Sequence, residues 1–94
     1  MSARAPMLAD RTALVDRYVT ELSLLAKEGS PEAVIEVLLT HYEDEDAHLL
    51  VYLPEGTSET SMDQLRDVLL KRSIEILEEV GLLILVGVYE RSEE

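Results

Sequence analysis

The chain has 94 residues, of which 20 are acidic and 8 are basic, and its formal net charge is −12 at pH 7. We expect residues 1–94 to form one small domain with a modest core, since a chain of this length does not support two. Direct binding of nucleic acid is disfavoured, because the surface repels phosphates and the chain has neither Trp nor Phe to stack on bases. Apolar residues make up 47% of the chain, which is too much for a disordered polypeptide.

The chain contains no cysteine, which excludes disulfides, thiolate metal sites and thiol nucleophiles. Residues 1–7 lack the apolar segment of an export signal, and the longest apolar stretch, 82–89, is much shorter than the roughly 20 residues of a membrane helix. We therefore expect a cytoplasmic protein that does not contact a membrane. Residues 1–9 are expected to form a flexible arm, and residues 91–94 a frayed tail.

Apolar residues recur at steps of three and four between Asp10 and Lys27, which predicts a helix with one broad apolar face. Gly29 is the expected C-cap of this helix. Ser30 and Pro31 then provide a favourable N-cap and first position for a second helix. The short link predicts that the two helices form an antiparallel hairpin. The apolar face of the first helix comprises Leu14, Val15, Tyr18, Val19, Leu22 and Leu25.

The predicted second helix turns Val34, Val37 and Leu38 inward, and the sequence does not decide at which residue this helix ends. It either stops near Tyr42 or continues through His48. The acidic run Glu43–Asp46 favours the earlier end, because negative charges at a helix C-terminus oppose the helix dipole.

The second half of the chain predicts a strand, a helix and a second strand. Leu49–Leu53 is a short apolar segment followed by turn residues. Ser61 and Gln64 form a capping box for a third helix that ends at Gly81. Residues 82–89 are rich in β-branched side chains and apolar on both alternating faces, as in a buried strand. The predicted fold is therefore α+β, a helical hairpin followed by a parallel βαβ unit, in the order ααβαβ.

A sheet of only two strands leaves unpaired backbone groups at both edges. Such a small sheet is also not expected to be stable alone. We therefore expect a homodimer in which a second copy of the chain completes the sheet.

The two histidines of the chain enclose the acidic run. If the second helix continued through His48, then His41, Asp44, Glu45 and His48 would share one helix face, at spacings of i, i+3, i+4 and i+7. Imidazole and carboxylate ligands suit Zn, Fe or Mn. A divalent metal site formed by His41, Glu45 and His48 is therefore one functional hypothesis.

The segment Glu45-x-x-His48 resembles the Glu-x-x-His motif of ferritin-like carboxylate proteins, including short forms that complete their iron site on dimerising. The resemblance covers four residues. It implies an all-helical fold and an iron site to which Glu21 would contribute a further carboxylate. The helix and strand predicted for the last third of the chain depart from that family.

No spacing of nucleophilic, acidic or basic residues predicts catalysis, so we expect no enzyme activity and no cofactor apart from the possible metal. Residues 43–94 hold fourteen acidic and four basic side chains, a charge of −10. We expect a small acidic interaction or regulatory module that binds a basic protein partner through Glu43, Asp44, Glu45 and Asp46. Metal binding and inhibition by nucleic-acid mimicry are the two alternatives.

Overall fold

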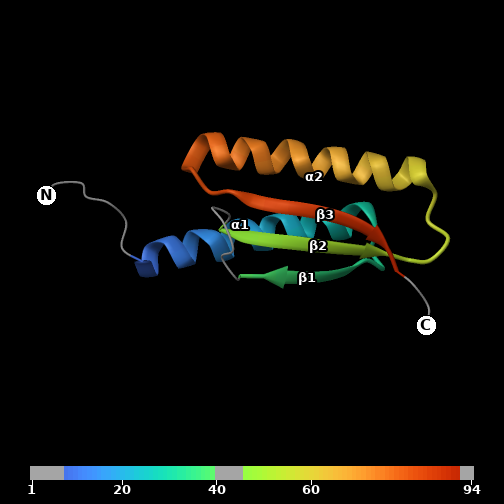
Figure 1. The fold of residues 1–94 in the computed structure, drawn as a ribbon, viewed down its shortest axis with the longest axis horizontal. Helices are drawn as coiled ribbons and strands as arrows, with labels where there is room; N and C mark the ends of the chain where they lie inside the picture. Colours follow the sequence, from blue (N-terminus) through green and yellow to red (C-terminus); the bar gives the residue numbers. More distant parts are fainter. Residues whose placement is uncertain (1–7, 40–45, 92–94) are drawn as a thin grey trace, which may run out of the picture.

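A computed structural model describes residues 8–39 and 46–91 of the chain, and Figure 1 shows the arrangement. The described residues form two long helices and three strands. In chain order these are α1 (Leu8–Gly29), β1 (Val34–Leu38), β2 (Ala47–Leu53), α2 (Glu59–Val80) and β3 (Ile84–Glu90). The order is therefore αββαβ.

The strands form a mixed sheet with β2 at its centre. β1 pairs with β2 in the antiparallel direction, and β3 pairs with the other edge of β2 in the parallel direction. α2 connects the two parallel strands, so the predicted βαβ unit and the mixed α+β class are confirmed. Over the described residues the sheet has three strands, one more than predicted.

The prediction of a second helix is wrong, because residues 34–38 form β1. The backbone N–H of Ala33 donates to the carbonyl oxygen of Ser30 at 2.9 Å, which places Pro31 at the second position of a β-turn. Proline suits that position as well as it suits the first turn of a helix. The turn leads into three β-branched residues, Val34, Ile35 and Val37, which favour a strand.

Helix α2 starts before the predicted capping box and ends where the sequence predicts. Its N-cap is Ser58, whose side-chain oxygen accepts from the backbone N–H of Ser61 at 3.1 Å, so assigning the cap to Ser61 was wrong. Gly81 is the C-cap, with φ of 76°, and its N–H donates to the carbonyl oxygen of Leu77 at 2.9 Å. The end of the helix at Gly81 is confirmed.

Gly29 has a different role from the predicted one. Among the described glycines, only Gly56 and Gly81 have positive φ, so Gly29 is not a left-handed cap. A Cβ atom at Gly29 would lie 2.8 Å from Cδ1 of Leu65 on α2. A side chain at Gly29 would therefore require the end of the Leu65 side chain to shift, because the end of α1 approaches α2 closely.

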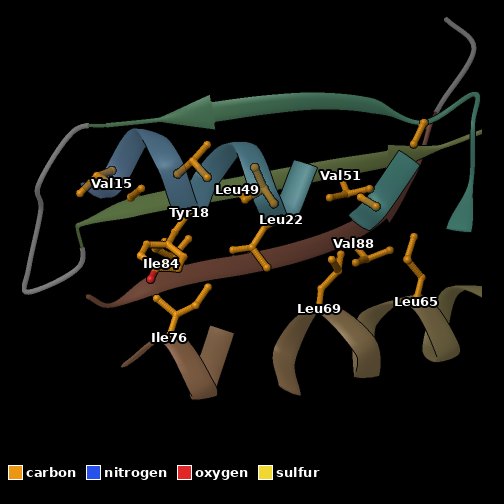
Figure 2. Packing of buried hydrophobic residues seen from close by; sticks show 14 of the residues in the cluster. Val15, Tyr18, Leu22, Leu49, Val51, Leu65, Leu69, Ile76, Ile84 and Val88 are labelled. Carbon is orange, nitrogen blue, oxygen red and sulfur yellow. The ribbon is translucent and has the colours of Figure 1, made fainter. Parts of the chain in front are cut away.

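The core lies between the helices and one face of the sheet (Figure 2). Along β2, every second residue is at most 1% exposed, and these side chains belong to one buried cluster with residues of both helices. Within the core cluster, α1 contributes Val15, Tyr18, Val19, Leu22 and Ala26, α2 contributes Leu65, Leu69 and Ile76, and β2 contributes Ala47, Leu49, Val51 and Leu53. The predicted apolar face of α1 is thus largely confirmed.

Neither helix of the described chain contains an apolar stretch long enough to cross a bilayer.

Replacing Gly81 tests the left-handed end of α2. We expect Gly81→Ala to lower the free energy of unfolding by about 1 kcal/mol, because a Cβ atom is strained at positive φ. Gly81→Asn should cost less, since asparagine adopts this conformation more readily. Urea unfolding followed by circular dichroism measures both variants, and equal stability of Gly81→Ala and the parent protein would contradict the assignment.

Candidate interaction surfaces

Asp46, one of the four acidic residues predicted to bind a partner, is buried, and its carboxylate is occupied within the molecule. Its Oδ1 accepts from Nε and Nη2 of Arg11 on α1, at 3.1 and 2.9 Å. Its Oδ2 accepts from the backbone N–H of Leu83 at 2.8 Å, and its own N–H donates to the carbonyl oxygen of Leu83 at 2.7 Å. The side chain is 10% exposed. Asp46 therefore joins α1 to the start of the parallel strand pair.

The other three residues predicted for partner binding, Glu43, Asp44 and Glu45, lie outside the described residues. Their contribution to the negative charge follows from the sequence. The acidic run is thus not uniform, because its last member is used by the fold.

His48 lies on β2 and is partly buried, on the side of the sheet away from the helices. The helical stripe considered for metal binding requires a helix through His48, and His48 instead lies in a strand. His41 and Glu45 lie outside the described residues. Among the residues that are described, no three His, Asp or Glu side chains are placed to hold a metal ion.

Glu21, which the ferritin-like resemblance implies as a metal ligand, forms an ion pair with Arg72 across the two helices. Arg72 also lies 3.1 Å from Oε1 of Glu75 and 3.7 Å from Oε2 of Glu79. The hydrogen bond from Arg72 lowers the pKa of Glu21 below its usual value, although partial burial opposes the shift. The same hydrogen bond raises the pKa of Arg72. One guanidinium thus serves three carboxylates and links α1 to α2.

Most of the remaining acidic side chains are exposed and have no ion pair. Within the described chain, four basic side chains also lack an ion pair, which leaves an excess of unpaired negative charge. The exposed carboxylates of the described chain without an ion pair are Asp16, Glu28, Glu32, Glu36, Glu55, Glu59, Asp67, Glu78 and Glu90. This excess is the electrostatic feature that a basic partner would meet.

The second candidate surface is the face of the sheet opposite the helices, which we call the open sheet face. The strand register gives it nine positions in three rows: Val34, Tyr52 and Tyr89; Glu36, Leu50 and Gly87; Leu38, His48 and Leu85. Six of the nine side chains are aliphatic or aromatic. Val34 and Tyr89 are each 45% exposed, and Leu38 and Leu85 are each 38% exposed. No other element of the described chain covers this face.

Two tyrosines lie together at one end of the open sheet face. The rings of Tyr52 and Tyr89 are 5.7 Å apart and inclined by 32°. The ring of Tyr89 lies over Gly87, because a Cβ atom at Gly87 would be 2.5 Å from the Tyr89 hydroxyl oxygen. Glycine in this strand therefore leaves room for an aromatic ring.

Sequence reasoning did not find the open sheet face, because it assigned Val34 and Leu38 to a helix. The β-branched run at the start of β1 was an available signal for a strand. The apolar character of residues 82–89 on both alternating faces was the second signal, since it requires a cover on each side.

An apolar groove of about 510 Å³ lies between α1 and β1. It is lined by Thr12, Ala13, Val15, Asp16, Val19, Val37 and Leu39. Asp16 is the one ionisable side chain of this lining. The groove therefore has little polar chemistry with which to orient a ligand.

Comparisons of the chain with protein-family models, with curated proteins and with solved structures gave no significant match. The functional argument therefore rests on the residues and geometry described above.

Removing the Asp46 carboxylate tests its role in the fold. We expect Asp46→Ala to lower the free energy of unfolding by about 2 kcal/mol, because the partly buried N–H of Leu83 loses its acceptor and Arg11 loses its partner. The control is Asp67→Ala on the exposed side of α2, which should not lower stability measurably. Urea titrations give both values, and a fully stable Asp46→Ala variant would contradict the structural role.

The Arg72 cluster predicts a pH-dependent stability. The pKa of Glu21 in the folded protein lies below its usual value of 4.5, so the ion pair stabilises the protein above that pH and is lost as the pH falls through the folded pKa. Arg72→Gln should therefore be less stable than the parent protein at neutral pH. Its loss of free energy of unfolding should be smaller than that of Asp46→Ala.

At an acidic pH below the folded pKa of Glu21, the difference between Arg72→Gln and the parent should shrink, because the carboxyl group is then protonated in both. Lys71→Gln, which removes a neighbouring base without an ion pair, is the matched control and should show no such pH dependence. Urea titrations at both pH values decide the matter, and a difference that does not change with pH would refute the role of Glu21.

Proposed function

We propose that this protein is a small acidic interaction or regulatory module that binds a basic protein partner, acts in the cytoplasm and has no catalytic activity of its own. The observation that carries the proposal is the excess of exposed carboxylates without ion pairs. Nine such carboxylates stand against four basic groups without an ion pair in the described chain. The absence of cysteine suits a reducing compartment.

The exposed side of α2 is the best-defined part of this acidic surface. Glu59, Asp67 and Glu78 lie along it over nearly the whole length of the helix. A helix is a rigid support, so these carboxylates keep a constant spacing that a partner can match. The sequence adds Glu43, Asp44 and Glu45 to the same excess of charge.

Asp46 is not part of the proposed binding surface, because its carboxylate is buried against Arg11 and the backbone of Leu83. The partner is instead expected to contact carboxylates that solvent reaches. Such a surface accelerates encounter with a basic protein and rejects other acidic proteins through repulsion.

The first step of the experiment identifies the partner. The full chain, immobilised through one terminus, is exposed to a soluble extract of its source cells at low salt, and bound proteins are identified by mass spectrometry. The strongest interaction partner is then purified, and its dissociation constant is measured by calorimetry.

We expect the affinity to fall at least about tenfold between low salt and about 0.5 M NaCl, because exposed charges are screened over a few ångströms at high ionic strength. The triple variant Glu59→Gln, Asp67→Asn, Glu78→Gln should also lower the affinity, because it removes three negative charges from α2. The matched control Glu59→Asp, Asp67→Glu, Glu78→Asp keeps the charge and should bind nearly as well as the parent. An affinity that is independent of salt would refute the electrostatic proposal.

A further inference from the structure

The open sheet face is unusual for a sheet that contains a parallel strand pair. Parallel strands are normally buried on both faces, whereas antiparallel sheets often have one polar face in water. Here the helices cover one face, and the other bears six aliphatic or aromatic side chains among its nine positions. Contiguous apolar surface of this kind in a soluble protein marks a contact with another molecule.

The open sheet face carries few charged side chains, so two copies of the chain can associate through it with little electrostatic repulsion. The protein has 28 acidic and basic residues among 94, but Glu36 is the one such residue among the nine positions of the open sheet face. Of the other exposed carboxylates without ion pairs, Glu90 lies at the end of β3, paired with the core-facing residue Leu53, and the rest lie on the helices and on the turns. Two copies with a charge of −12 each repel one another at any surface rich in carboxylates.

We propose that the open sheet face is the interface of a homodimer, in which the sheets of two copies stack face to face and the helices form the two outer layers. This proposal concerns a different surface from the acidic one and does not depend on the proposed function. It also differs from completion of the sheet edge to edge, which the sequence led us to expect.

The rows of the open sheet face favour one arrangement of the two copies. A twofold axis parallel to the strands places β1 over the partner's β3, with each β2 over its counterpart. The row that contains Glu36, Leu50 and Gly87 then faces itself in reverse, so Glu36 lies over a glycine and the leucines meet at the axis. A twofold axis across the strands would instead bring the two Glu36 carboxylates together, which like-charge repulsion disfavours.

The size of the face sets the expected strength of the dimer. Three strands of up to seven residues are about 14 Å wide and about 23 Å long at the usual strand spacing and rise. The flat area of two such faces is about 640 Å² in total, below the roughly 1,000 Å² of a stable specific interface, so the dimer is a weak one. We therefore expect a dissociation constant on the order of 10 μM, with monomer and dimer in exchange.

A rival apolar surface provides the control. On α2, Leu70, Ile74 and Leu77 are 37%, 54% and 42% exposed and lie on one flank of the helix. This flank is separate from the open sheet face. A substitution there changes exposed apolar surface without touching the proposed interface.

The test is the mass of the full chain in solution, measured by sedimentation equilibrium across concentrations above and below about 10 μM. We expect a mass that rises from 10.6 kDa towards twice that value. Leu85→Glu on β3, or Val34→Glu on β1, should raise the dissociation constant at least about 100-fold, because it places a charge in the apolar interface. Ile74→Glu should leave dimerisation unchanged.

A second measurement needs no substitution. In a mixture of isotope-labelled and unlabelled protein, nuclear Overhauser effects between copies should reach the methyl groups of Leu50 and Leu85, and not those of Ile74. A parent protein that stays monomeric at millimolar concentration would overturn the proposal. So would a dimer that Ile74→Glu dissociates, or one whose contacts between copies involve only the α2 flank.

Discussion

The central strand β2 is buried at every second residue on its helix-facing side, and the positions of all the other elements depend on that alternation. Ala47, Leu49, Val51 and Leu53 point into the core, so both helices lie on that one side. A slip of one residue would exchange the two faces, bringing His48 and Tyr52 into the core. The hydrogen bonds between Asp46 and Leu83 oppose such a slip, because they join the start of β2 to the segment before β3.

The same alternation separates two kinds of surface. The helical side carries most of the exposed carboxylates, and Arg72 neutralises part of their charge while it joins α1 to α2. The opposite side presents the open sheet face, where Glu36 is the one carboxylate. The two proposals use different sides of the molecule, so a homodimer through the sheets would leave both acidic helical layers accessible to a partner.

The sequence predicted some elements better than others for identifiable reasons. α1 has a regular apolar face, and α2 ends at a glycine whose left-handed conformation few other residues adopt, so both predictions agree with the structure. Residues 31–38 were ambiguous for two reasons. Proline after serine suits a turn as well as the start of a helix. The five residues that follow the turn are mostly apolar, and so short a run fits the helical period as well as the strand period. The pairing of β1 with β2, a contact between distant residues, decides between them.

By itself, the sequence determined the mixed α+β class, the βαβ unit formed by β2, α2 and β3, and the large excess of acidic over basic residues. These depend on local periodicity, capping and composition, which act over a few residues. Only the tertiary structure decided that Asp46 is buried against Arg11 and that six apolar side chains from three strands lie on one uncovered face. The reason is that both features join residues distant in sequence, and no local pattern specifies which strands become neighbours.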